Sequence, residues 1–192
     1  MIASDKVLVT ELENVFIEGN INLREIDCLI VKQPYASLIA YGSKRWEFRT
    51  YNCEKRGVIC IGSSKGKPMK TGDSYLNSVA TSFPRGFALS VGILTDSFMA
   101  TGKHLEKALQ NEENAIVHGY KIRTASKPLG EPVVDILKAI KDRDWRMYVW
   151  AFESISPLKT MIPLQNSVGG STWTKITLHE EEPFSRSLES YF

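Results

Sequence analysis

The pattern of apolar residues in this 192-residue chain predicts an α+β fold with five or six strands, one short helix and a partly helical insertion. Three observations lead to this expectation. Short apolar or alternating segments recur along the chain at the spacing of strands. A helical pattern over residues 33–42 begins near a proline and ends at a glycine. Residues 97–143 then interrupt the strand pattern with helical spacing.

The first part of the domain is expected to run in the order strand, helix, strand, strand. Residues 29–31 form an apolar core strand, and residues 33–41 form a short helix bounded by the proline and the glycine. Residues 46–49 alternate apolar and charged side chains, as in a strand with one solvated face. Residues 58–61 are apolar throughout, which predicts a strand buried on both faces.

The later elements continue the mixture of helix and strand. Residues 73–82 predict a helix capped by Asp73, and residues 87–93 predict a strand in which Gly92 marks a bulge. Three further strands are expected to close the sheet, over residues 147–152, 158–164 and 171–178.

The same patterns divide the chain into three parts. Residues 1–27 form an N-terminal extension, expected to be a hairpin or an edge strand. Residues 28–178 form one domain, which carries the insertion at 97–143, helical around residues 105–112 and 133–140. Residues 179–192 form a frayed tail.

Composition predicts a soluble, intracellular and cytoplasmic protein. No segment approaches the roughly 18 apolar residues needed to span a bilayer. The three cysteines, Cys28, Cys53 and Cys60, lack C-x-x-C spacing, so we expect reduced and mostly buried thiols. The three histidines are isolated in the sequence, so neither a metal nor a cofactor is expected.

Basic residues are concentrated in one stretch of the chain. Residues 44–70 hold eight basic side chains and two acidic ones, a local excess of +6, whereas the whole chain has a net charge of +2. Segregated positive charge is typical of a surface that binds phosphate groups. The basic residues are Lys44, Arg45, Arg49, Lys55, Arg56, Lys65, Lys67 and Lys70.

The segment Gly42-Ser43-Lys44-Arg45-Trp46-Glu47-Phe48-Arg49 places three charged groups beside the end of the predicted helix. Glu47 and Arg49 share one face of the predicted strand, about 6.6 Å apart along the backbone, and Lys44 lies in the turn before them. From the residues alone, this group is either a surface ion-pair cluster or a ligand site.

The stretch from Cys28 to about Lys67 resembles the ASCH domain (activating signal cointegrator homology), a relative of the PUA RNA-binding fold. The family pattern Gly-x-Lys-x-x-Glu-x-Arg is met by residues 42–49. Tyr35 and the Arg56-Gly57 pair also agree with the family, and residues 150–173 are similar to its closing strands. Residues 1–27 and 97–143 match it poorly. The resemblance implies a PUA-like β-barrel with a short helix at one end.

The resemblance also implies a basic cleft that receives RNA or a modified nucleotide. The loop after the strand at residues 58–61 offers serines and lysines that suit phosphate, although a flexible lysine-bearing turn is the alternative. Trp150 is expected to stack on a base. The residues expected to bind nucleic acid are Gln33, Lys44, Glu47, Arg49, Ser63, Ser64, Lys65 and Trp150.

Two other functions stay open at this point, so the sequence leaves undecided whether the chain is an enzyme. Some ASCH proteins are amidohydrolases that act on acetylated cytidine, and their nucleophilic threonine falls at the position of Glu47, which has no hydroxyl group. A small hydrolase of this kind, or a ribonuclease-like enzyme, would use Lys44 and Glu47 as catalytic groups. The third alternative is an adaptor that binds a protein partner.

Overall fold

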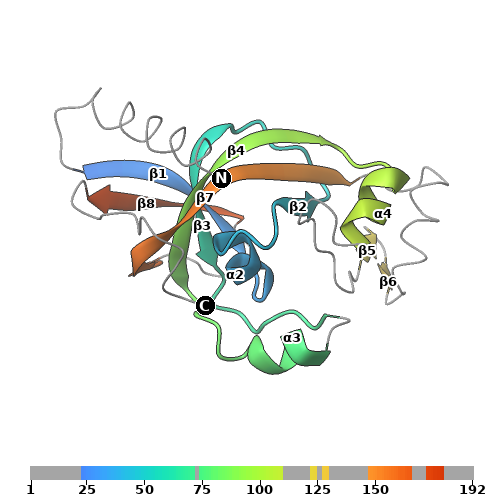
Figure 1. Cartoon of the computed structure of the whole chain (residues 1–192), viewed down its shortest axis with the longest axis horizontal. Coiled ribbons are helices and arrows are strands. Elements are labelled where there is room, and N and C mark those ends of the chain that lie inside the picture. Colours follow the sequence, from blue (N-terminus) through green and yellow to red (C-terminus); the bar gives the residue numbers. More distant parts are fainter. Residues whose placement is uncertain are drawn as a thin grey trace.

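The computed structural model describes residues 23–71, 74–109, 122–124, 127–129, 147–165 and 172–179. Its elements are distributed along the whole of this range (Figure 1). They are β1 (Leu23–Val31), α2 (Tyr35–Ala40), β2 (Trp46–Arg49), β3 (Gly57–Ser63), α3 (Ser74–Val79), β4 (Phe87–Met99), α4 (Gly102–Leu109), β5 (Ile122–Thr124), β6 (Lys127–Leu129), β7 (Tyr148–Pro163) and β8 (Trp173–His179).

Six of the strands form one mixed sheet in the order β2-β7-β4-β3-β1-β8. β1 and β3 are parallel, and all other neighbours in this sheet are antiparallel. Figure 1 shows β4 and β7 running together as a long curved pair, with β1 and β8 toward one end and β2 toward the other. The predicted α+β fold with six mixed strands is therefore confirmed. The described strands leave the sheet open between β2 and β8, rather than closed as a barrel.

The short helix α2 forms where the sequence predicts it and packs on one face of the sheet. Its inward side chains include Tyr35, Ala36 and Ile39, which join a core cluster with Leu29 and Ile61. Each large apolar side chain buried in this way contributes about 1.5–3 kcal/mol relative to an exposed one. The helix thus covers the parallel strands β1 and β3 and directs the chain toward β2.

The central strands β1 and β3 are buried on both faces, as residues 58–61 predict. Leu29 and Ile61 belong to the cluster under α2, whereas Cys28 and Cys60 belong to a second cluster with Ile176. Neighbouring residues of a strand point to opposite faces, so each of these strands supplies both cores.

Strand β4 contains the bulge that its glycine predicts. The register between β4 and β7 shifts between Val91 and Ile93, on either side of Gly92. A Cβ atom at Gly92 would lie 3.1 Å from Ile155 Cγ1, which is closer than ordinary packing allows. The missing side chain therefore lets the two long strands approach each other.

Several predicted boundaries differ from those in the structure. β4 continues to Met99, and β7 is one strand where two were expected, because each of the two long strands satisfies the hydrogen bonds of the other. α3 is shorter than the predicted helix over residues 73–82, and Asp73 lies outside the described residues. α4 confirms helix at the start of the insertion. The expectations for residues 1–22, 133–140 and 180–192 fall outside the described residues.

Two features are absent from the described residues. No helix among them is long and apolar enough to cross a membrane. They contain no group of three or more histidine, cysteine, aspartate or glutamate side chains arranged to hold a metal ion.

Candidate functional site

Three charged side chains meet where the turn after α2 leads into β2. Lys44 is placed by that turn, in which Gly42 has a φ of 75° and the Lys44 N–H donates to Leu38 O at 2.9 Å. Glu47 and Arg49 lie two residues apart on β2, so they share a face. The Glu47 carboxylate contacts Lys44 Nζ at 3.5 Å and Arg49 Nη2 at 3.2 Å. We call these three residues the charged cluster.

Lys44 is the most deeply buried member of the charged cluster, with 2% of its surface exposed. Its ammonium donates to the first carbonyl of β2 and lies 5.7 Å from the ring centre of Tyr35 and 5.5 Å from that of Phe48. Burial lowers the pKa of Lys44, an effect that Glu47 opposes and Arg49 reinforces. Lys44 therefore supports Glu47 from inside the protein and does not face solvent.

Arg49 is the member of the charged cluster that reaches the surface, with 20% of its side chain exposed. Its Nη2 donates to Ile30 O at 3.3 Å, and its guanidinium lies 5.7 Å from the ring centre of Trp150. The Arg49 Nε is buried and has no acceptor among the described residues. Two cations against the single carboxylate of Glu47 leave the charged cluster with an excess of one positive charge.

Aromatic side chains pack beneath the Arg49 guanidinium, on its buried side. Trp150 is 0% exposed, and its ring stacks against that of Trp173 with centres 5.7 Å apart and an interplanar angle of 19°. The Trp150 indole N–H donates to Tyr51 O at 3.2 Å. A ring this deeply buried cannot offer a face to a base, so the structure assigns Trp150 a supporting position where direct stacking was expected.

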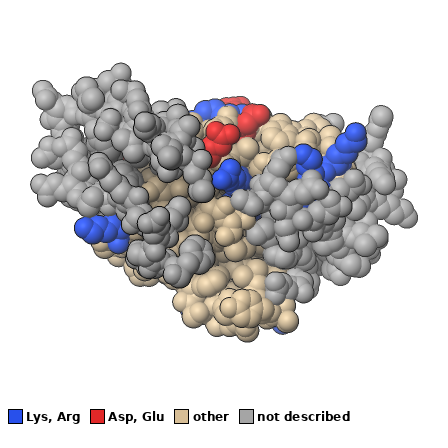
Figure 2. All heavy atoms as spheres, in the orientation of Figure 1, with Lys and Arg blue, Asp and Glu red and all other residues tan. Residues whose placement is uncertain are grey.

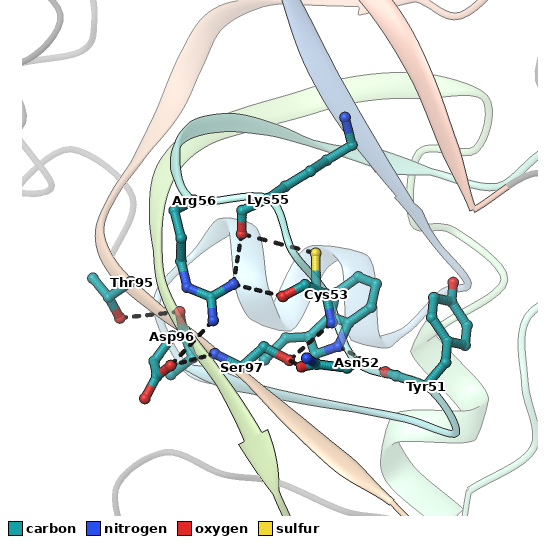
Figure 3. A network of polar contacts seen from close by, with 10 residues as sticks. Tyr51, Asn52, Cys53, Lys55, Arg56, Thr95, Asp96 and Ser97 are labelled. Atoms are coloured by element: carbon teal, nitrogen blue, oxygen red, sulfur yellow. Dashed lines mark hydrogen bonds and ion pairs between the residues drawn. The ribbon is translucent and has the colours of Figure 1, made fainter.

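The loop over residues 50–56 is fastened to β4 by the polar network of Figure 3. Arg56 donates to Cys53 O at 2.6 Å and contacts the Asp96 carboxylate at 3.2 Å. The Ser97 hydroxyl accepts the Cys53 N–H at 3.0 Å. These contacts fix the segment between β2 and β3 and, with it, the aromatic support of Arg49.

Gln33 and Ser63 lie inside the protein, although both were expected to bind nucleic acid. The Gln33 amide donates to Ser37 Oγ at 2.9 Å and to Pro84 O at 2.7 Å, and Gln33 is 1% exposed. The Ser63 hydroxyl, which is fully buried, donates to Phe87 O at 3.1 Å and accepts the Phe87 N–H at 3.2 Å. Their polar groups are engaged in holding loops together.

Ser64 and Lys65 follow β3 at the same end of the sheet as the charged cluster. The Ser64 N–H donates to Val31 O at 2.8 Å, one residue beyond the carbonyl of β1 that holds Arg49. The Ser64 hydroxyl accepts the Gly66 N–H at 3.1 Å. Lys65 is exposed, and its aliphatic stem lies against Gly86, where a Cβ atom would come within 2.7 Å of Lys65 Cγ.

Two adjoining hollows extend from Lys65 toward α3. One has a volume of about 530 Å³, the other about 600 Å³, and both are lined by Thr81 and Arg85. Among the described residues, the basic ones that line the hollows are Lys65, Lys67, Lys70 and Arg85, and none of the described lining residues is acidic. We call this surface the basic groove.

Sequence reasoning identified part of the basic groove and missed the rest. The cluster of lysines at residues 65–70 was visible as local charge, whereas Arg85 lies beyond α3 in the sequence and joins the lysines only through the fold. The only signal at Arg85 was its place between a proline and a glycine just before a strand.

Comparison with solved structures finds the ASCH protein from Zymomonas mobilis, with a TM-score of 0.45 and 12% identity over 81% of this chain and 89% of that one. Two single-substitution mutants of that protein give the same TM-score at 11% identity, over 81% of this chain and 91% and 89% of theirs. No model of a known family matches the chain, and no curated protein matches it. The structures found are ASCH domains, the kind of domain that residues 28–67 resemble in sequence. Likeness at this level assigns no role to any residue.

Proposed function

We propose that this chain binds RNA or a modified nucleotide and that Arg49 of the charged cluster contacts an anionic group of the ligand. The observation that carries the proposal is the excess of one positive charge in the charged cluster, of which Arg49 is the partly exposed member. A charge that is partly removed from water is costly unless it is paired. A phosphate beside the exposed part of the Arg49 guanidinium would balance this charge.

The three residues have different parts in this proposal. Lys44 neutralises Glu47 from inside the protein, so the charge of Arg49 remains available on the exposed side. Glu47 and the carbonyl of Ile30 orient the guanidinium. A planar guanidinium binds phosphate through paired N–H donors, which makes it a stronger anchor than an ammonium on a flexible stem.

The first prediction tests Arg49 as the anchor. Arg49→Ala should weaken binding of a short RNA by about 10- to 100-fold, because a hydrogen bond to a charged group contributes about 1.5–3 kcal/mol. Arg49→Lys should recover only part of the affinity. Calorimetric titration at low salt measures the change, and thermal unfolding checks that each variant is folded.

Lys159→Ala is the matched control for the Arg49 variant. It also removes one positive charge, from an exposed position on β7, and should change affinity by less than about twofold. The proposal fails if folded Arg49→Ala binds as well as the original chain. It also fails if the original chain has no affinity for RNA at low salt.

A small hydrolase is the second candidate, favoured by the lowered pKa of Lys44 beside Glu47. A lysine whose pKa is lowered by burial gives up its proton more readily, which a general base requires. The same titration series separates the two functions when Glu47→Gln is included. Turnover of acetylated cytidine or an RNA oligomer that is lost in Glu47→Gln, while binding persists, would select the hydrolase.

A further inference from the structure

The four cations of the basic groove have no partners among the described residues. Lys65, Lys67, Lys70 and Arg85 form no ion pair and no hydrogen bond with any of them. Three exposed cations elsewhere in the described part of the chain each contact a carboxylate. These are Lys55 with Asp27, Arg56 with Asp96 and Lys175 with Glu25.

Acidic side chains are also absent from the visible side of the lobe that holds α3. In Figure 2 the acidic atoms gather at one place above the centre of the view, whereas the α3 lobe, at the bottom, shows none and has basic atoms only at its lower edge on this face. A groove of four unpaired cations without a carboxylate in its lining favours a polyanion over a neutral or basic ligand.

The walls of the basic groove are fixed by hydrogen bonds from Gln33, in the turn between β1 and α2. The Met69 N–H donates to Gln33 O at 2.7 Å, and the Gln33 amide donates to Pro84 O at 2.7 Å. One buried residue therefore holds the two segments that face each other across the groove. Further along, the Asn77 side chain makes three hydrogen bonds to Thr71, which tie the end of the lysine-bearing loop to α3.

The shape and lining of the basic groove suit a chain of phosphates better than a single nucleotide. Pockets for small molecules are mostly enclosed and apolar, with a few polar groups. Here two hollows share Thr81 and Arg85, so the cations follow one another along a connected surface. Phe83 lies among the cations, in the combination of basic and aromatic side chains that proteins use for single strands.

The charged cluster and the loop that leads to the basic groove are attached to neighbouring residues at the end of β1. Ile30 O accepts a hydrogen bond from Arg49, and the next carbonyl, Val31 O, accepts one from Ser64. We infer that the basic groove binds the phosphate backbone of single-stranded RNA, so that the ligand of this protein is an oligonucleotide. This inference rests on the proposed function and specifies its ligand.

The second prediction is that affinity grows with the length of the RNA. Uridine monophosphate and oligouridylates of four and eight nucleotides are titrated calorimetrically against the full chain at several salt concentrations. For the longest ligand, five phosphate contacts on a single strand, from the four groove cations and Arg49, predict a slope of log affinity against log salt of about −3.5. Removing three groove cations, in Lys67→Ala/Lys70→Ala/Arg85→Ala, should reduce the slope to about −1.4 and lower affinity by about 100-fold.

The matched control removes three exposed cations from elsewhere, as Lys103→Ala/Lys159→Ala/Lys175→Ala. It has the same change in total charge and should keep most of the affinity and of the salt slope. Uridine monophosphate should bind the groove variant as well as it binds the original chain, because its phosphate contacts the charged cluster.

The outcomes separate this inference from the proposed function. The inference fails if affinity does not depend on the length of the RNA, or if the groove variant binds the longest RNA normally. In either case the proposed function still stands if Arg49→Ala weakens binding. If the groove variant loses affinity but Arg49→Ala does not, the inference and RNA binding stand, and the part of the proposed function that makes Arg49 the anchor fails. Equal binding of polyaspartate with the same number of charges would overturn RNA as the ligand class.

Discussion

Lys44 shows how a single buried residue can be more informative about function than about stability. Moving a cation out of water costs several kcal/mol, and its attraction to one carboxylate often does no more than offset that cost. Lys44 nevertheless lies at 2% exposure against two aromatic rings, with Glu47 as its only carboxylate among the described residues. Its position is explained if it holds Glu47, and through Glu47 orients Arg49.

The third prediction concerns the pH dependence of stability at Lys44. Because burial lowers its pKa below 10.5, the unfolded chain binds more protons than the folded chain just below pH 10.5. The free energy of unfolding of the original chain, relative to Lys44→Met, should therefore rise as the pH approaches 10.5 from below. Urea unfolding of both proteins at a series of pH values measures this difference.

The comparison with Lys44→Met also removes an opposing effect. Burial raises the pKa of Cys60, so that thiol stays neutral in the folded chain and stability falls once the unfolded thiol begins to ionise. This contribution is present in both proteins and cancels in the difference. A difference that stays constant or falls with pH would contradict a lowered pKa at Lys44.

At the level of elements, β8 completes the core although it lies at an edge of the sheet. It pairs antiparallel with β1, from Leu29 opposite Trp173 to Leu23 opposite His179. Its side chains alternate, with Ile176 buried in the second core cluster and Thr177 exposed. The last described strand thus covers the first one.

The fourth prediction is that Ile176→Ala lowers the free energy of unfolding by about 2–4 kcal/mol, because it leaves a cavity in a packed cluster. Thr177→Ala, on the next and exposed position of the same strand, should cost less than about 1 kcal/mol. Chemical denaturation monitored by circular dichroism compares the two. Similar losses for both variants would show that β8 does not pack as described.

The whole molecule is organised as two core clusters that share one sheet. Cys28 and Cys60 are both fully buried and directly opposite each other on β1 and β3, with their sulfur atoms 3.2 Å apart. They lie in the second cluster, whereas Cys53, in the loop fixed to β4, belongs to the first. The reactivity of the three free thiols therefore reports on the opening of different core clusters.

The fifth prediction concerns access to these thiols. Iodoacetamide should modify Cys28 and Cys60 at least about a thousandfold more slowly in the folded chain than in urea, since exposure requires global opening. Cys53 should react before them, because local opening of its loop is sufficient. Mass spectrometry follows each site over time.

A cysteine placed at exposed Tyr75 supplies the control for reagent activity, since it should react within minutes in the folded chain. Rapid modification of Cys28 or Cys60 in the folded chain would contradict the burial of β1 and β3 on both faces.

The sequence was sufficient for those features that depend on local periodicity. The glycine-ended helix, the alternation that places Glu47 and Arg49 on one face, and the doubly buried strand at residues 58–61 all follow from spacing, and the structure contains them. Gly92 was also interpretable, because a glycine inside a strand pattern usually marks a bulge or a close approach.

Features that depend on contacts between distant segments could not be predicted in this way. Nothing local distinguishes Trp150, which is buried beneath Arg49, from a tryptophan that offers a face to a base. The side-chain amide of Gln33 donates a hydrogen bond to the carbonyl of Pro84, which lies 51 residues away in the sequence. For the same reason, Arg85 joins the lysines of residues 65–70 only once α3 has folded between them.

The carbonyl groups at the end of β1 have a consequence for anyone who redesigns this protein. Ile30, Val31 and Gln33 each use a backbone oxygen to hold a different segment, through Arg49, Ser64 and Met69. A backbone carbonyl is not removed by exchanging a side chain, so substitutions at Ile30, Val31 and Gln33 leave these three acceptors in place. An insertion or deletion of one residue here would instead displace all three segments together. Specificity should therefore be retuned by changing side chains on the attached segments, with the length of this short stretch left intact.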